Sequence, residues 1–224
     1  MRAEVAPRWR ILIAVGLTVV VLDQVSKFLA VRYLTPGIAN AHFARSGHPF
    51  PDGATRVRLM GELGSLRAFG LFYADVVDPC RPVQAYCPTV AVVSGFWNWR
   101  YVENPGAAWG LLATAPAFIR LPFFYAVSAG AIVFILWFYR RLQPDQTLLA
   151  VALSLVFGGA IGNFIDRLHL TYVIDFIDWY AGQAHWPTFN VADAGITVGV
   201  LLLIVDMIIH RETNPTTEAR ISEK

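Results

Sequence analysis

The feature that most constrains this chain is a set of four apolar segments, each close to the length of helix that crosses a bilayer. They cover about residues 9–31, 118–139, 147–165 and 191–209. A membrane core needs about 20 mostly apolar residues in helical form. In lipid, every backbone donor and acceptor must be paired within the protein, so we predict that the four segments are transmembrane helices.

The composition supports a membrane protein. Hydrophobic residues make up 56% of the 224 and charged residues only 15%, against about 25% charged in soluble domains. A soluble core of this size would leave too much apolar surface in water, so the excess must face lipid. The net charge is only +2, without a basic stripe interleaved with aromatics, which argues against nucleic acid as a partner.

Positive charges in the short flanks of the spans predict their orientation. If all four spans cross the membrane, one side collects Arg2, Arg8, Arg10, Arg140, Arg141, Arg211, Arg220 and Lys224. We therefore predict that both termini are cytoplasmic. A cleaved signal peptide is the alternative for the first segment, but polar residues rather than a small-x-small cleavage site follow its apolar run.

The outer loop between the first two spans, residues 32–117, is too long for a simple connector. Its later part alternates Trp97, Trp99 and Tyr101, which indicates strand. The expected fold is therefore an all-α membrane protein of four transmembrane helices, with a small β-rich cradle or lid at the outer surface. A loosely packed loop with interfacial aromatics is the alternative.

Polar residues inside the apolar segments are costly in lipid and often mark function. Asp23 and Lys27 are four apart, so they share a helix face. A buried ion pair that fixes the helix in its bundle is the simpler explanation for them. Asn163, Asp166 and Arg167 close the third segment, either as part of a site or as a polar helix end in water.

Two further carboxylates, Asp175 and Asp193, lie at the two ends of one short outer loop. Two close carboxylates share a proton, so such a pair can activate a water and protonate a leaving amine. The alternative is structural: Asn190 caps the fourth helix, and Asp193 gains from the helix dipole. The sequence contains no zinc-binding motif, serine-nucleophile elbow or phosphate-binding loop.

Five blocks in order resemble the lipoprotein signal peptidase (signal peptidase II) family, bacterial aspartic peptidases that cleave prolipoprotein signal peptides. The blocks are residues 22–27, 103–110, 162–167, 173–176 and 189–193. The chain departs from the family in a longer connector, at about 36–96. We therefore expect one integral-membrane peptidase domain over 1–224, with that connector as a periplasmic insert.

The resemblance implies that Asp175 and Asp193 form the catalytic dyad. It implies that Asn104, Asn163, Arg167 and Asn190 hold substrate and orient the dyad, with Asp23 and Lys27 in support. The implied substrate is a prolipoprotein whose lipobox Cys bears diacylglycerol, cut before that Cys in the bacterial inner membrane. Membrane lipid and globomycin-type inhibitors are the other implied partners, and no metal or cofactor is expected.

Two other classes of protein remain open at this point. A small proton-coupled transporter or channel subunit would also use carboxylates within its spans, although it predicts them at all membrane depths. Here Asp23, Asp166, Asp175 and Asp193 gather on the outer side, and only Asp206 lies near the inner end. A structural adaptor, with an outer loop that binds a partner, is the third possibility.

Cys80 and Cys87 lie in the outer loop, with six residues between them. If that loop is outside the cytoplasm, a disulfide is favoured over two free thiols. We predict that alkylation of protein taken from its native membrane labels both thiols only after reduction. Equal labelling before and after reduction would contradict the disulfide.

Overall fold

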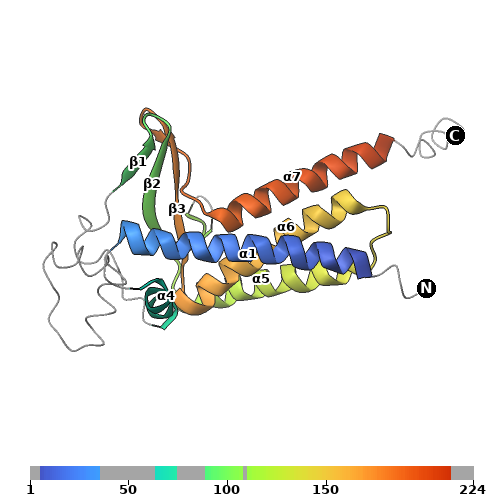
Figure 1. Ribbon diagram of the computed structural model, residues 1–224, viewed down its shortest axis with the longest axis horizontal. Helices are drawn as coiled ribbons and strands as arrows, with labels where there is room; N and C mark the ends of the chain where they lie inside the picture. Colours follow the sequence, from blue (N-terminus) through green and yellow to red (C-terminus); the bar gives the residue numbers. More distant parts are fainter. Residues whose placement is uncertain (1–5, 36–63, 75–88, 108–109, 213–224) are drawn as a thin grey trace, which may run out of the picture. The chain divides into compact units, whose positions relative to one another are not determined.

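The computed structural model describes residues 6–35, 64–74, 89–107 and 110–212. Figure 1 shows the helices and strands, coloured along the sequence. In chain order these are α1 (Ala6–Leu34), α4 (Ser65–Ala74), β1 (Val90–Val93), β2 (Trp97–Asn104), α5 (Ala117–Tyr139), α6 (Thr147–Leu170), β3 (Val173–Ala181), β4 (Ala184–His185) and α7 (Val191–Glu212). Cys80 and Cys87 lie outside the described residues.

Four of these helices, α1, α5, α6 and α7, are long and apolar enough to cross a membrane, which confirms the four predicted spans. Three of them end later than predicted: α1 continues to Leu34, α6 to Leu170 and α7 to Glu212. The extra turns of α6 hold Asp166 and Arg167, which are buried. Partners within the protein therefore support this helix end, rather than water.

The chain divides into two compact units, and α1, α5 and α6 each contribute residues to both. The first unit contains 6–21, 126–162 and 191–212 of the described chain. Its apolar core is formed by Leu12, Ile135, Tyr139, Leu142, Ala150 and Leu153. The Tyr139 hydroxyl donates to the carbonyl of Arg8 at 2.7 Å, which ties α5 to the start of α1.

Small residues of α6 let its backbone approach two other helices of the first unit. A Cβ on Gly158 would lie 2.7 Å from the carbonyl oxygen of Gly16 on α1. A Cβ on Gly159 would collide with the carbonyl of Ala192 and lie 2.7 Å from Ile196 Cγ1 on α7. Small residues of α6 therefore permit close packing of the helices in this unit.

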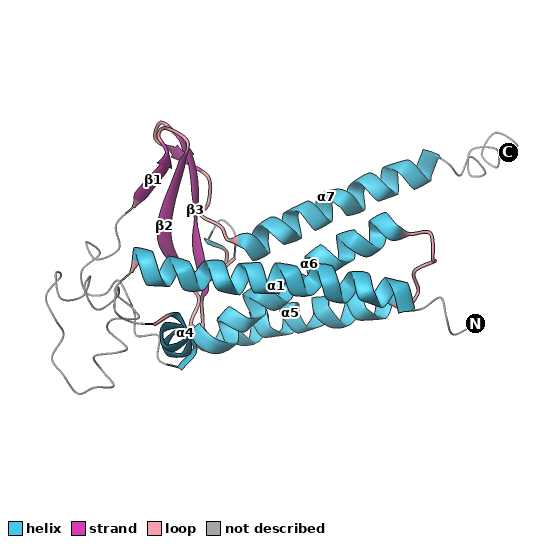
Figure 2. Ribbon diagram, in the orientation of Figure 1, coloured by secondary structure: helices cyan, strands magenta, loops and turns pink. Residues whose placement is uncertain are grey.

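The second unit contains 22–35, 64–74, 89–107, 110–125 and 163–190 of the described chain. Its centre is an antiparallel sheet in the order β1-β2-β3-β4, seen as the magenta strands of Figure 2. Asn98 pairs with Asp178 and Val102 with Asp175, with an irregularity between Trp99 and Val102. The predicted small sheet is confirmed, whereas β3 as a central strand of it was not predicted.

The glycines of α6 generate the first structural prediction. We expect Gly159→Ala to lower the free energy of unfolding by about 1–3 kcal/mol, because the added methyl group meets backbone that cannot move aside. Gly130→Ala on α5 is the matched control: its Cβ would have nothing within 4 Å, so stability should hold or rise slightly. Thermal unfolding in detergent micelles compares the two, and equal stabilities would contradict the close packing.

Candidate active site

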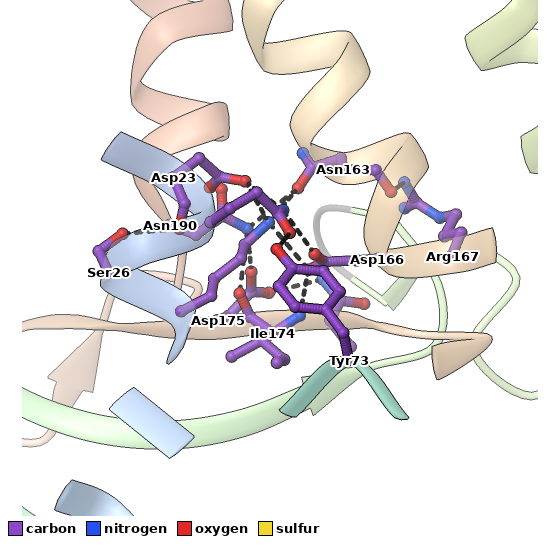
Figure 3. A network of polar contacts seen from close by, with 12 residues as sticks. Asp23, Ser26, Tyr73, Asn163, Asp166, Arg167, Ile174, Asp175 and Asn190 are labelled. Atoms are coloured by element: carbon purple, nitrogen blue, oxygen red, sulfur yellow. Dashed lines mark hydrogen bonds and ion pairs between the residues drawn. The ribbon is translucent and has the colours of Figure 1, made fainter. Parts of the chain in front are cut away.

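Asp175, a candidate catalytic residue, lies on β3 in the second unit. Its side chain is buried, and both carboxylate oxygens accept a hydrogen bond from an amide. Asn104 Nδ2, at the end of β2, donates to Oδ2 at 2.9 Å. Asn190 Nδ2 donates to Oδ1 at 2.7 Å. Two neutral donors therefore hold the carboxylate without neutralising its charge. Figure 3 shows Asp175 and Asn190 within the polar network.

Asn190 directly precedes α7 and is fully buried. Besides Asp175, its amide nitrogen lies 3.2 Å from Asn163 Oδ1 and 3.2 Å from the carbonyl of Ile174. The chain reaches this position because Phe189 pairs with Ile177 of β3 through backbone hydrogen bonds. The segment before α7 is thus bound to the strand that carries Asp175.

Lys27 joins three elements of the second unit. Its ammonium lies 2.8 Å from Asp23 Oδ2 on α1 and 2.8 Å from Asp166 Oδ2 on α6. It also donates to Asn163 Oδ1 at 3.1 Å. Asp166 Oδ2 in turn accepts the backbone N–H of Ile174 at 3.0 Å. The predicted Asp23–Lys27 pair is therefore confirmed. It is part of a larger group, the Lys27 cluster, formed by Asp23, Lys27, Asn163 and Asp166. Through Asp166 this cluster holds the backbone of β3 at Ile174, the residue before Asp175.

The Arg167 guanidinium contacts two backbone carbonyls and an aromatic ring of the second unit. Its guanidinium donates to the carbonyl of Gly106 at 3.0 Å and to that of Asn163 at 3.4 Å, and it lies 4.5 Å from the ring centre of Phe124. The N–H of Gly106 donates to Asn104 Oδ1 at 3.0 Å. In this structure Arg167 therefore orients the loop that positions Asn104.

Asp193 lies in the first turn of α7, as predicted, and is half-buried. It belongs to the first unit, whereas Asp175 belongs to the second. The meeting of the two carboxylates therefore stays a prediction. Asn104, Asn163, Asn190, Arg167, Asp23 and Lys27 form one connected network with Asp175.

A second buried carboxylate on β3, Asp178, was given no role from the sequence. It accepts hydrogen bonds from Asn98 at 3.0 Å and from His185 at 2.8 Å. Burial alone would raise the pKa of Asp178, but these two hydrogen bonds and the nearby charges of His185 and Arg100 together outweigh it and leave the pKa below its usual value. Asp178 is therefore an ionised group that fastens β4 to the sheet, and its partners mark it as structural.

Gln24 lies beside Asp23 in the first of the five sequence blocks, but the sequence predicted no role for it. Its amide nitrogen lies 3.1 Å from Asp23 Oδ2 and 3.0 Å from Asp166 Oδ1. A polar residue inside an apolar span was the available signal. Among the described residues, no group of three or more His, Cys, Asp or Glu side chains is arranged to hold a metal ion.

Membrane-crossing helices and a buried carboxylate held by amides define an integral membrane protein with an enzyme-like site. Comparison with known proteins identifies the family. The family model described as signal peptidase (SPase) II matches residues 68–209. The chain belongs to this family.

Named relatives and solved structures support the same family and fold. A lipoprotein signal peptidase of Anaeromyxobacter sp. (strain Fw109-5) is 41% identical over 201 residues, 88% of this chain and 84% of that protein. One of Geobacter sulfurreducens is 50% identical over 120 residues, 54% of this chain and 74% of that protein. Two solved chains, described as bacterial membrane enzyme structures by the in meso method, have TM-scores of 0.58 and 0.57. They are 24% and 25% identical, with 91% and 88% of this chain and 90% and 91% of those chains covered.

These findings confirm the predicted family, the fold class and the function as an aspartic-type peptidase of prolipoprotein signal peptides. They favour this function over the proton-coupled transporter and the structural adaptor. The multi-pass membrane topology is confirmed as well. The roles of the individual site residues rest on the geometry above and on the resemblance.

The Lys27 cluster generates a prediction about stability. Lys27→Met should lower the free energy of unfolding by about 3–5 kcal/mol, because it leaves two buried carboxylates without their cation. Thermal unfolding in detergent measures this loss. The control is Arg140→Met, which removes an exposed cation and should stay within about 0.5 kcal/mol. Equal effects of the two substitutions would show that the Lys27 cluster does not stabilise the fold.

Proposed function

We propose that Asp175 and Asp193 together cleave the peptide bond before the lipid-modified cysteine of prolipoproteins. The observation that carries this proposal is the buried Asp175 carboxylate, held by Asn104 and Asn190 in a member of the signal peptidase II family. Carboxylates with fixed orientation and restricted access to water are suited to acid–base catalysis.

The proposed reaction needs no covalent intermediate on the enzyme. The ionised aspartate takes a proton from a water, and the resulting hydroxide adds to the scissile carbonyl carbon. The protonated aspartate gives its proton to the carbonyl oxygen. The tetrahedral intermediate then loses its C–N bond: the leaving amine takes up a proton from one aspartate, and a hydroxyl of the intermediate gives its proton to the other aspartate as the new carboxylic acid forms, so the dyad again holds one proton. Because the two groups titrate as a pair, the proton belongs to the dyad rather than to either aspartate.

The substrate proposal follows from where the chain carries these residues. Asp175 comes soon after the end of α6, and Asn190 directly precedes α7. Both helices are long enough to cross a membrane. Residues at helix ends lie near the edge of the bilayer, where the peptide bond beside a diacylglyceryl cysteine would be met. The amides of Asn163 and Asn104 offer donors and acceptors to an extended substrate backbone.

We also propose the location and domain organisation. The positive flanks of the spans support both termini in the cytoplasm and a site at the periplasmic face of a bacterial inner membrane. The single-domain peptidase over 1–224 would then carry α4 and β1 within its periplasmic insert at about 36–96. Globomycin-type compounds are the proposed inhibitors on the strength of the family alone.

Substitution of each aspartate tests the dyad. We expect Asp175→Asn and Asp193→Asn each to lower kcat on a diacylglyceryl-modified precursor by about 10² to 10⁴, because either change removes one partner of the proton exchange. Cleavage is followed by the size shift of the precursor on a gel. Wild-type turnover by either variant would refute the dyad.

Two controls make that assay specific. Asp145→Asn changes an exposed aspartate between α5 and α6 and should keep wild-type turnover. A precursor that lacks the lipid should be cleaved poorly by the wild-type enzyme, and globomycin should block cleavage of the lipidated form. Efficient cleavage of the unlipidated precursor would contradict the proposed substrate.

A further inference from the structure

Helix α4 lies in the long segment between the first two membrane helices, and most of it falls within the residues that the family model matches, 68–209. It packs its apolar side chains against α1: the Phe28 ring lies 5.2 Å from the ring of Phe69 and 5.9 Å from that of Phe72. Phe72 is buried, and its carbonyl lies 2.9 Å from His169 Nε2 on α6. The last turn of α4 is thus held against both helices that supply the Lys27 cluster.

Tyr73, in this last turn, reaches the polar network directly. Its hydroxyl donates to Gln24 Oε1 at 2.6 Å, and Figure 3 shows the Tyr73 side chain turned toward the network beside Asp166. The other end of the Gln24 amide donates to Asp166 and Asp23 at 3.0 Å and 3.1 Å. One glutamine therefore connects the insert to both carboxylates around Lys27.

The hydroxyl is a dependable donor. Burial, and then the nearby carboxylates of Asp166 and Asp23, raise the pKa of Tyr73 to about 12. The group is therefore protonated throughout the neutral range. It can hold Gln24 Oε1 only as a donor, because that oxygen is an acceptor.

Charge explains why the orientation of this amide matters. Asp23 and Asp166 carry two negative charges, and Lys27 supplies one positive charge between them. Asp166 also accepts hydrogen bonds from two neutral donors, the Gln24 amide and the backbone N–H of Ile174, which help to stabilise its buried charge. A reversed amide would place Oε1 against two carboxylates, whereas the Tyr73 hydroxyl favours the orientation that donates to them.

We propose that Tyr73 is a positioning residue for catalysis, which acts through Gln24 and Asp166 on the strand that carries Asp175. Asp166 holds the N–H of Ile174, the residue next to Asp175. Loss of the Tyr73 hydroxyl frees the Gln24 amide, weakens the donor set on Asp166, and loosens the backbone at Ile174. Small displacements of a catalytic group can lower the rate strongly. This inference rests on the proposed role of Asp175.

The direct test is Tyr73→Phe, which keeps the ring and removes the hydroxyl. We expect kcat on a diacylglyceryl-modified precursor to fall about 10-fold with KM nearly unchanged, since one hydrogen bond that orients the site is lost and no proposed substrate contact is touched. The matched control is Tyr33→Phe on α1, where the ring is 71% exposed. It should retain wild-type kcat.

A double-substitution cycle separates positioning from a general structural role. Gln24→Met removes the amide through which Tyr73 acts, so adding Tyr73→Phe to it should change kcat less than twofold. Hydrogen exchange of the α4 amides should be the same in wild type and in Tyr73→Phe, because the aromatic contacts of the helix remain. Additive losses in kcat, or loss of protection throughout α4, would overturn the proposal.

The proposal and the proposed function fail in different ways. Wild-type enzyme that does not cleave the lipidated precursor, or Asp175→Asn enzyme that still does, refutes the proposed function. If wild type cleaves and Asp175→Asn does not, then wild-type kcat in Tyr73→Phe refutes the positioning role alone. A rise in KM with kcat unchanged would also refute it, because that result assigns Tyr73 to substrate binding.

Discussion

The interaction on which the candidate site depends is the Lys27 ammonium between the carboxylates of Asp23 and Asp166. All three groups are buried, and charges removed from water are costly unless they are fully paired. The cluster satisfies them with charge and hydrogen bonds from α1, α6 and β3 together. If any one of these elements moved, a buried charge would lose its partner, and the resulting energetic cost keeps the position of β3 fixed.

Amides connect this cluster to Asp175 without transmitting its charge. Asn163 accepts from Lys27 and lies beside Asn190, which donates to Asp175. A charged donor in the place of Asn190 or Asn104 would stabilise the carboxylate strongly and reduce its use as a base. A neutral donor instead fixes its orientation and leaves proton exchange available. The network therefore separates the group that stabilises the fold from the group proposed to react.

The sequence predicted the features that short-range patterns record. Apolar length gave the four spans, and the four-residue spacing gave the Asp23–Lys27 pair. The blocks around Asn104, Asn163 and Asp175 pointed to residues that the fold brings together. Asp166 as the second partner of Lys27 was not predictable, because nothing in periodicity records which side chains meet across helices. The pairing of β2 with β3 was missed for the same reason, since their strands are separated by two membrane helices.

The position of α4 shows how a helix within a long connector can become part of a site. A long connector costs little more closure entropy than a short one, because that cost grows only with the logarithm of length. A helix inside it that buries Phe72 and Leu71 offsets the entropy of its own ordering. Once α4 is packed against Phe28, Tyr73 lies within reach of Gln24, and a single hydroxyl then joins α4 to the buried charges around Lys27.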